Sequence, residues 1–183
     1  MITVEEMIEL ENKAEAKGVS KLKLMERAGK GVADIISVNY DKSKITFVCY
    51  HGNNGGDGFA AAYFLLKSGC KVKVLFIGDE NKLKPEAEHY FKLLPKAVFV
   101  DRIDGAEVIV DCMLGIGAKG KLKDVIKKYV KLINSFNACK ISVDLPTGLY
   151  SGEDYVKADL VITMHDLKPG LDKFNTEIVA IGL

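Results

Sequence analysis

Three polar, glycine-bearing segments hold most of the residues that could do chemistry in this chain of 183 residues. They are Asn53-Asn54-Gly55-Gly56-Asp57-Gly58, the segment from Asp111 to Gly120, and Asp144-Leu145-Pro146-Thr147-Gly148. Each begins where a short apolar run ends, so each is expected at the carboxyl end of a strand. Open parallel sheets bind ligands at that edge, because helix N-termini and loop amides converge there. The three segments are therefore the candidate ligand site.

The first segment combines two adjacent amides, Asn53 and Asn54, with the carboxylate of Asp57. A tight strand-to-helix turn would account for the glycines alone, since glycine adopts positive φ freely and asparagine tolerates it. Two amides and a carboxylate exceed what a turn needs, and the glycines would let a ligand approach the backbone. We therefore predict that Asn53, Asn54 and Asp57 contact a ligand.

The second segment contains Gly115-x-Gly117-x-x-Gly120, which has the spacing of a dinucleotide-binding fingerprint. The pattern is weak by itself, because it lies late in the chain and not after the first strand. Its glycines would free backbone amides at the start of the following helix, where a pyrophosphate is favoured. A plain glycine loop is the alternative. Lys119 and Lys121 could assist phosphate binding, although lysine runs usually lie on solvated faces.

Asp111 and Asp144 each follow an apolar run, so their carboxylates are expected at the lip of the sheet, partly shielded from water. Burial raises the pKa of a carboxyl group and a nearby cation lowers it, so such residues can be tuned for proton transfer or ion binding. A helix cap or turn is the commoner role for a lone Asp there. Asn54, Asp111 and Thr147 together offer hard oxygen ligands, which suit an alkali or alkaline-earth cation and not zinc.

Other candidates for chemistry are weak. His51, His89 and His165 are predicted in surface or capping roles, and no Ser-His-Asp order or Cys-His pairing marks a nucleophile. The cysteines are well separated, without a C-x-x-C pair or a His at metal-ligand spacing. We expect free thiols, and neither a disulfide framework nor zinc.

Composition restricts the class of protein. The formal net charge of +1 and the 48% of hydrophobic residues argue against disorder and against binding through bulk charge. No apolar stretch approaches the ~20 residues needed to cross a bilayer, and the N-terminus lacks the features of a secretion signal. We expect a cytoplasmic protein with a single domain over residues 1–183, and no nucleic-acid or membrane partner.

Helices and strands must position these residues, and the expected elements alternate along the chain. Thr3 and Glu6 have capping-box spacing before a first helix that Gly18 ends, and Ser20 can cap a second helix. The expected strands are 45–50, 72–77, 97–100, 108–112, 141–143 and 160–163, with 178–181 as a candidate last strand, and the expected later helices are 59–66, 84–94 and 122–136. Apolar strands that alternate with helices predict an α/β fold, a three-layer αβα Rossmann-like domain. Its sheet is expected to be mostly parallel, with helices on both faces and N-terminal helices.

At these residues the sequence resembles the YjeF N-terminal domain family, over nearly the whole chain. The matching motifs are Leu24-Met25-Glu26-Arg27-Ala28-Gly29, N-N-G-G-D-G at 53–58, D-x-x-x-G-x-G-x-x-G at 111–120, Ser142-Val143-Asp144-Leu145-Pro146-Thr147-Gly148, and the ending from Ala158-Asp159-Leu160 to Lys168-Pro169-Gly170. Two features depart from the family pattern. Tyr50-His51-Gly52 stands where many members have G-x-G, and the dehydratase domain fused to many microbial members is absent from this sequence.

The enzymatic members of this family are NAD(P)HX epimerases, isomerases of nicotinamide nucleotide repair that interconvert the R and S forms of hydrated NADHX and NADPHX at nicotinamide C6. The resemblance implies substrate contacts from Asn53, Asn54, Gly55, Gly56, Asp57, Gly115, Ile116, Gly117, Ala118, Lys119, Gly120, Lys121 and Asp144. It places Asp144 at the reactive end of the nucleotide, where we predict acid/base catalysis. It also implies a potassium ion near Asn54, Asp111 and Thr147, which organises the loops, together with a homodimer. Any dehydratase partner would be a separate chain.

Two competing functions remain open at this point. Some relatives of the fold are non-catalytic modules, often dimeric, that serve in RNA-decapping scaffolds or bind lipoproteins. Such a module could lose the ion and substrate residues without losing the fold, whereas here Asn54, Asp57, Asp111, Asp144 and Thr147 are all present. An ordinary NAD(P)-dependent dehydrogenase fits poorly, because the first strand does not lead into a dinucleotide fingerprint. We therefore favour the epimerase.

Overall fold

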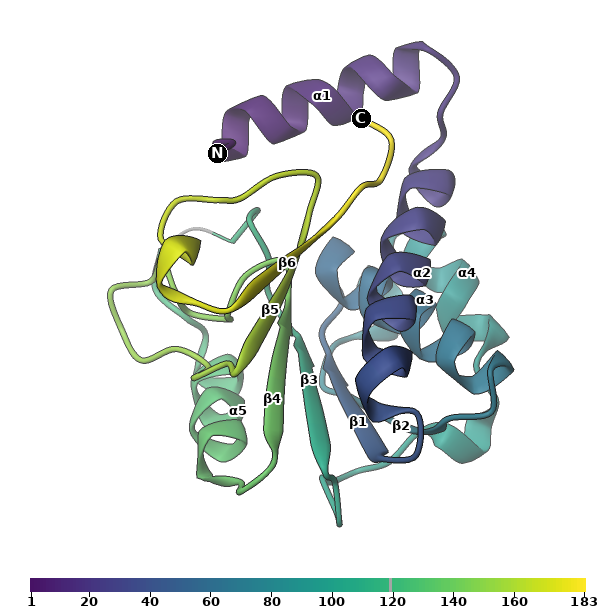
Figure 1. Ribbon diagram of the computed structural model, residues 1–183, viewed down its shortest axis with the longest axis vertical. Helices are drawn as coiled ribbons and strands as arrows, with labels where there is room; N and C mark the ends of the chain where they lie inside the picture. Colours follow the sequence, from purple (N-terminus) through teal and green to yellow (C-terminus); the bar gives the residue numbers. More distant parts are fainter. Residues whose placement is uncertain (119) are drawn as a thin grey trace.

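The computed structural model describes residues 1–118 and 120–183 and contains a six-stranded sheet in which every described pair of neighbours is parallel. The strand order is β2-β1-β3-β4-β5-β6 (Figure 1). The bounds are β1 Lys44–Cys49, β2 Lys71–Phe76, β3 Val108–Cys112, β4 Cys139–Val143, β5 Leu160–Met164 and β6 Thr176–Val179. The predicted α/β class with a parallel sheet is confirmed.

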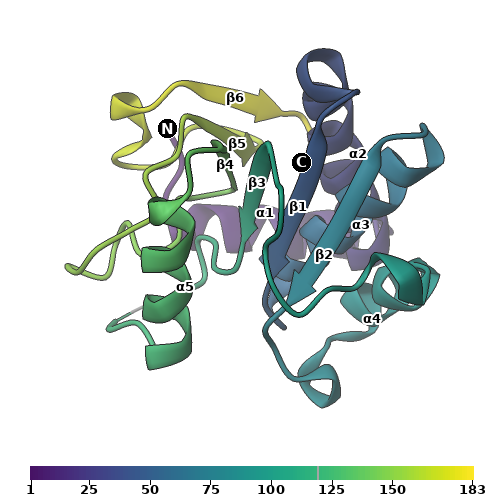
Figure 2. The same ribbon diagram turned by 90° about the horizontal axis from the view of Figure 1, so that it is seen from below.

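Helices cover both faces of the sheet, because alternate residues of each buried strand point to opposite sides. On one face lie α2 (Lys21–Tyr40), α3 (Asn53–Lys67) and α4 (Pro85–Leu93), and on the other lies α5 (Asp124–Ser135) (Figure 2). In β1, Phe47 packs in the same cluster as Ile36 of α2, whereas the next residue, Val48, packs with Ile126 of α5. The expected three layers follow from this alternation.

The N-terminal helix α1 (Val4–Ala16) lies across the end of the sheet, beside the segments that follow the strands (Figure 1). The predicted capping box is present: the Glu6 amide donates to Thr3 Oγ1 at 3.2 Å, and the Thr3 amide donates to Glu6 Oε2 at 2.8 Å. The Ile2 amide donates to the Leu167 carbonyl at 2.8 Å, just beyond the carboxyl end of β5. This bond ties the start of the chain to the candidate ligand edge.

Two predicted strands differ from the structure. The expected strand 97–100 is wrong, because the chain forms the 3₁₀ helix η2 (Lys96–Val98) after Pro95 and only Phe99 bridges to Val74. The Val98 amide is used within this turn, in a bond to the Pro95 carbonyl. The last strand is Thr176–Val179, earlier than the expected 178–181. The other 3₁₀ helices are η1 (Glu80–Lys82) and η3 (Leu171–Lys173). None of the described helices has the length and apolar character needed to span a membrane.

Candidate active site

The segment Asn53–Gly58 forms the first turns of α3 (Asn53–Lys67), so the predicted glycine loop is wrong, whereas the predicted helix at 59–66 is confirmed as part of α3. Close packing explains the glycines. A Cβ on Gly55 would lie 1.7 Å from the Tyr50 carbonyl oxygen, and one on Gly58 would lie 2.7 Å from Cys112 Cβ. The glycines therefore let the start of α3 sit against the ends of β1 and β3. Asn54 and Asp57, three residues apart, share a face of the helix.

Asn54 is buried, and neither its amide nitrogen nor its amide oxygen has a hydrogen-bond partner among the described residues. Buried polar groups are nearly always paired, because an unpaired one costs about 1 to 3 kcal/mol. Its neighbour Asn53 is exposed. The unpaired Asn54 amide is therefore the clearest sign of a missing partner at this edge of the sheet.

Asp111, at the carboxyl end of β3, is the centre of a buried hydrogen-bond network. Its Oδ1 accepts from Thr147 Oγ1 at 2.7 Å and from the Met113 amide at 3.2 Å. Its Oδ2 accepts from Ser142 Oγ and from the Thr147 amide, both at 2.9 Å. Burial raises the pKa of Asp111, and the bonds from Thr147, Met113 and Ser142 oppose that rise. The network joins the β3 segment to the β4 segment, as their shared position at the sheet edge predicts.

Asp144 follows β4 in a left-handed backbone conformation, with φ of 68°, which a non-glycine residue rarely adopts. This conformation aims its carboxylate at two donors. Oδ2 accepts from the Ile116 amide at 2.6 Å, and Oδ1 lies 3.0 Å from Lys168 Nζ. A Cβ on Gly115 would lie 2.4 Å from Asp144 Oδ2 and 3.4 Å from Asn54 Cβ. Gly115 thus lets the residues after β1, β3 and β4 converge.

Lys168 was not among the predicted site residues, although its K-x-G motif was part of the resemblance. Its side chain is fully buried, and besides Asp144 its Nζ donates to Thr163 Oγ1 and to the Met164 carbonyl, each at 2.6 Å. A lysine is almost never fully buried unless it is paired. The Lys168 ammonium is therefore a candidate functional group, because its three partners lie at the carboxyl ends of β4 and β5. The sequence motif alone did not reveal it.

Two further carboxyl groups lie near this ion pair. Asp57 has a pKa raised well above its ordinary value, first by burial and then by the charges of Asp144 and Glu11, while Lys168 opposes the rise. Glu11 of α1 has a raised pKa through burial and then the charge of Asp144. Glu11 was missed by the sequence analysis, because an acidic residue in an amphipathic first helix resembles ordinary surface charge.

Residues 113–118 and 120–123 lie outside helices and strands, and α5 starts only at Asp124, so the amides of these residues do not form the start of the following helix as predicted. The Ile116 amide is instead occupied by Asp144. Lys121 is exposed, and Lys119 lies outside the described residues. A hollow separates this loop from the turn after β4, lined among others by Gly115, Gly120, Pro146 and Tyr150. The predicted substrate loop therefore borders a small hollow, whose other side is formed by the turn that follows Asp144.

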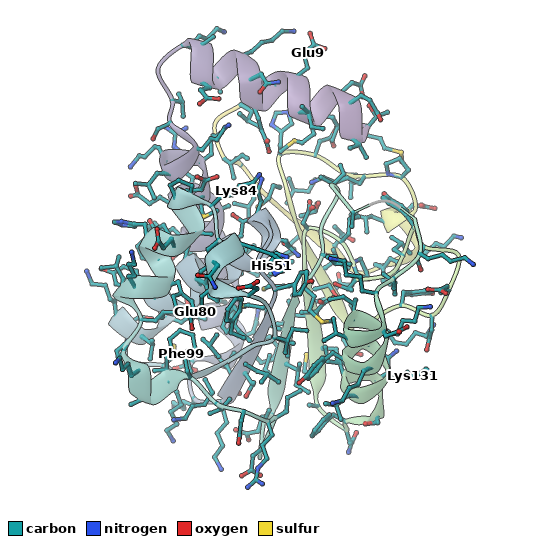
Figure 3. All side chains as sticks on the ribbon, turned by 180° about the vertical axis from the view of Figure 1, so that it is seen from behind. Glu9, His51, Glu80, Lys84, Phe99 and Lys131 are labelled. Atoms are coloured by element: carbon teal, nitrogen blue, oxygen red, sulfur yellow. The ribbon has the colours of Figure 1, made fainter. Side chains whose placement is uncertain are left out.

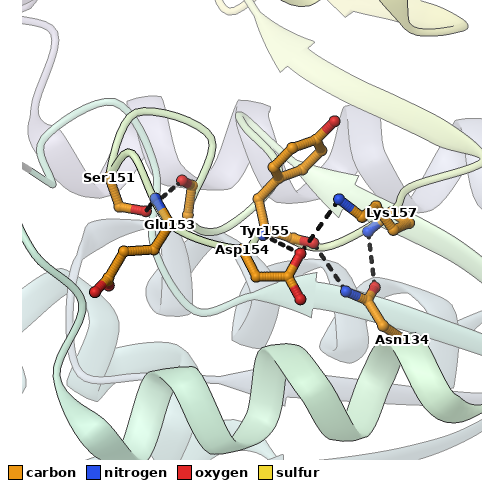
Figure 4. Close-up of polar contacts among 7 residues, drawn as sticks. Asn134, Ser151, Glu153, Asp154, Tyr155 and Lys157 are labelled. Atoms are coloured by element: carbon orange, nitrogen blue, oxygen red, sulfur yellow. Dashed lines mark hydrogen bonds and ion pairs between the residues drawn. The ribbon is translucent and has the colours of Figure 1, made fainter.

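The connection from β4 to β5 is braced against α5 by Asn134 (Figure 4). Its Nδ2 donates to the Tyr155 carbonyl and its Oδ1 accepts from the Lys157 amide, both at 2.8 Å. The Val156 amide, between these two residues, donates to the Thr147 carbonyl at 3.0 Å. The brace thus holds the turn that carries Thr147 and its bonds to Asp111.

His51 and the four cysteines show no arrangement typical of catalysis. His51 Nδ1 accepts from the Asp79 amide at 3.2 Å, which fits the expected capping role. Cys49, Cys70 and Cys112 are buried free thiols, and Cys139 is a partly buried one. Within the described part of the chain, no three His, Cys, Asp or Glu residues are grouped so that they could hold a metal ion. Chemistry at this edge therefore depends on the carboxyl groups, Lys168 and the Asn54 amide.

The sequence profile of a known family, described as YjeF-related protein N-terminus, matches residues 21–170. The chain belongs to this family. The matched span contains every predicted site residue, and it begins after α1, which carries Glu11. The resemblance drawn from the glycine and aspartate motifs is thereby confirmed.

Relatives within the family include both short and long proteins. The chain is 40% identical to the "Bifunctional NAD(P)H-hydrate repair enzyme Nnr" of Archaeoglobus fulgidus, over 94% of this chain and 38% of that protein. It is 32% identical to the "NAD(P)H-hydrate epimerase" of Nitrosopumilus maritimus, over 94% of this chain and 88% of that protein. The chain thus spans well under half the length of the bifunctional relatives and most of the length of this epimerase.

A solved structure has the same architecture. The crystal structure of yeast ynu0 superimposes with a TM-score of 0.86 at 19% sequence identity, covering 97% of this chain and 86% of that one. At 19% identity this likeness shows the fold alone, and it assigns no role to the residues of the site.

Proposed function

We propose that this protein is an NAD(P)HX epimerase that interconverts the R and S forms of hydrated NADHX and NADPHX at nicotinamide C6. The observation that carries the proposal is the pairing of two unlike carboxyl groups at one edge of the sheet. Asp144 forms an ion pair with Lys168 and accepts a hydrogen bond from the Ile116 amide. In contrast, the pKa of Asp57 is raised by burial and by the charge of Asp144. Carboxyl groups in such different environments serve as a base and an acid at the same pH. The names of the relatives favour this enzyme over a binding module.

Epimerisation requires the C6 centre to lose and regain its configuration. In one route the bond between C6 and the ring nitrogen breaks. The C6 hydroxyl then loses its proton as an aldehyde forms, and the nitrogen gains a proton. Ring closure on the opposite face reverses both proton transfers. In the other route the C6–O bond breaks, and the departing hydroxyl gains a proton and leaves as water. A water molecule then adds to the opposite face of C6 and loses a proton. Each route needs one group that accepts a proton and one that donates it. Asp144 is proposed as the acceptor and Asp57 as the donor.

The nucleotide is proposed to lie along the loop from Gly115 to Lys121, with its hydrated ring at Asp144. The hydrogen bond from the Ile116 amide of this loop to Asp144 Oδ2 supports that placement. Backbone amides of the loop and the first turn of α3 would bind the polar groups of the nucleotide. Lys168 is fully buried and holds the Asp144 carboxylate in place through their ion pair.

A monovalent cation, expected to be potassium, fits this site on two grounds. The Asn54 amide oxygen is buried without a partner among the described residues, and the carboxyl groups of Asp111 and Asp144 are buried at the same edge of the sheet. Asn54, Asp111 and Thr147 would hold the ion through oxygen atoms. Because Asp111 already accepts four hydrogen bonds, its oxygen would be shared between the ion and those donors. Bound potassium would supply a fixed positive charge that orders the loops.

The deciding experiment supplies both epimers of NADHX, in potassium buffer, to the purified protein together with an S-specific dehydratase and ATP, and follows NADH by absorbance. We expect complete recovery at a rate set by this protein, and a loss of at least about a hundredfold in that rate for Asp144→Asn. Recovery that stops when the S form is consumed, with folded protein present, would refute the epimerase and favour the non-catalytic module. A homodimer and a separate dehydratase partner stay predictions, to be tested by light scattering and by co-purification.

A further inference from the structure

The residues that follow β1 form an aromatic pair at the ligand edge. The rings of Tyr50 and His51 lie against each other, with centroids 3.8 Å apart and planes inclined at 34°, and both residues are partly exposed. The His51 ring is held by the Asp79 amide, which donates to its Nδ1 at 3.2 Å. Seen from behind, His51 lies between Glu80 and α5, which carries Lys131 (Figure 3). The pair is therefore a fixed aromatic surface at the carboxyl end of β1.

Lys123, the residue before α5, lies against this aromatic pair. Its Nζ donates to Tyr50 Oη at 3.4 Å and lies 5.7 Å from the centroid of the Tyr50 ring. Neither contact neutralises the ammonium charge. In the part of the chain that the structure describes, no carboxylate forms an ion pair with Lys123, whereas Lys127, one helical turn later, lies 2.8 Å from Glu153 Oε1. The exposed Lys123 ammonium can therefore bind an anion without breaking an ion pair.

Tyr50 also connects the aromatic pair to the candidate active site. A Cβ on Gly55 would lie 1.7 Å from the Tyr50 carbonyl oxygen, so the Tyr50 backbone lies against the first turn of α3. Gly55 directly follows Asn54, whose buried amide has no partner among the described residues. Through Lys123, Tyr50 contacts the end of the loop that follows β3. The two segments that carry most of the predicted substrate contacts thus meet at Tyr50.

Charge around the aromatic pair suits a phosphorylated ligand. Burial lowers the pKa of His51, the charges of Lys82 and Lys123 lower it further, and the charge of Asp79 opposes them. The His51 ring is therefore uncharged at neutral pH. Aromatic side chains bind nucleobases by stacking, whichever the base, and lysine binds phosphate. An uncharged aromatic pair beside an unneutralised lysine is an arrangement that binds a nucleotide through its base and its phosphate together.

We propose that Tyr50, His51 and Lys123 form a subsite for an adenine nucleotide, in which the adenine ring stacks on the Tyr50–His51 pair and Lys123 binds phosphate. This nucleotide is the adenosine half of the substrate, whose hydrated ring lies at Asp144. That part of the proposal rests on the proposed epimerase function, whereas the binding of an adenine nucleotide at these three residues does not. Tyr50 stands where many family members have glycine, so the subsite depends on this chain's own residues.

The first test measures the Kd of the two halves of the dinucleotide separately, by NMR titration with ADP and with nicotinamide mononucleotide. Tyr50→Leu keeps an apolar side chain and removes the ring, and we expect it to weaken ADP about tenfold. Lys123→Met should weaken ADP about threefold. Both variants should leave the Kd of nicotinamide mononucleotide within about twofold of the wild type, because the reactive half binds elsewhere.

The matched controls come from α5. Lys128 Nζ lies 5.6 Å from the centroid of the Tyr129 ring, so Tyr129→Leu and Lys128→Met remove the same kind of pair from within a helix. Both should leave the Kd of ADP unchanged. No saturable binding of ADP to the wild type would overturn the proposal, as would an unchanged Kd of ADP in folded Tyr50→Leu and Lys123→Met. Equal weakening of both halves would mean a general disturbance of the site and would also overturn it. The exposed Lys123 decides the matter if Tyr50→Leu does not fold.

The second test asks whether the subsite belongs to the substrate or to a separate regulatory nucleotide. ADP should inhibit epimerisation competitively, and Tyr50→Leu should raise KM about tenfold while kcat stays within about twofold, because stacking of a remote group binds substrate and transition state alike. Inhibition by ADP that is not competitive would overturn the assignment to the substrate. If the wild type does not epimerise at all, the proposed function fails, and the ADP titrations still decide the subsite.

Discussion

Lys168 Nζ lies 3.0 Å from Asp144 Oδ1, with the lysine side chain fully buried and the aspartate side chain only 11% exposed. Asp144 reaches this position from a left-handed backbone conformation, and Lys168 is fixed by bonds to Thr163 Oγ1 and the Met164 carbonyl. A strained residue and a buried cation that meet at a ligand edge are features of functional sites, where stability is given up for a defined arrangement of charge.

Replacing Lys168 by Met should leave the Asp144 carboxylate buried beside no cation. Removing one partner of a buried ion pair costs about 3 to 5 kcal/mol, so we expect a loss of about 3 kcal/mol in the free energy of unfolding, measured with urea. The double variant Asp144→Asn/Lys168→Met should lose less than the sum of the two single variants, because their charges are coupled. Strict additivity would contradict the pair as described.

Replacing Asp57 by Asn should stabilise the protein at alkaline pH while it impairs activity. The pKa of Asp57 is raised in the fold, so the folded state binds more protons than the unfolded state, and its stability falls as pH rises from the ordinary carboxyl range through the raised value. Asp57→Asn removes this dependence, and we expect a gain of about 1 kcal/mol at pH 8. Urea unfolding at several pH values measures it, and a steeper dependence in the variant would show the sign to be wrong.

Asn54 provides a test of the cation that does not depend on catalysis. If potassium binds the unpaired amide oxygen, the wild type should unfold at a higher temperature in potassium chloride than in choline chloride of equal ionic strength. A cation at a hundred times its Kd stabilises a protein by about 2.7 kcal/mol. Asn54→Leu should lose this difference and keep its stability in choline, because it removes a buried polar group without a partner. Equal unfolding temperatures of the wild type in both salts would refute the cation site.

Gly115 should tolerate no side chain. An added Cβ would lie 2.4 Å from Asp144 Oδ2, so Gly115→Ala should displace that carboxylate and lower kcat/KM about a hundredfold. Gly52→Ala is the matched control, because its Cβ would have no neighbour within 4 Å, and we expect activity within about twofold of the wild type. Equal activity of both variants would mean that the position of Asp144 is not critical.

Local sequence signals predicted most of the fold. Thr3 and Glu6 form a capping box within one helical turn, and the run Val108–Cys112 forms a strand that is buried on both faces of the sheet. The start of α3 was not predictable in this way. Glycine disfavours helices, and only the approach of the Tyr50 carbonyl and Cys112 to that helix shows why glycine is needed there.

The sequence by itself determined which residue types carry the chemistry, since Asn54, Asp57, Asp111, Asp144 and Thr147 stand in recognisable motifs after apolar runs. The tertiary structure decided how they act. The burial of Lys168 against Asp144, the unpaired amide of Asn54 and the partial burial of Glu11 all depend on segments far apart in the chain. Charge, burial and hydrogen bonding between distant segments are properties of the packed chain, and they set the pKa of each carboxyl group, which no local pattern encodes.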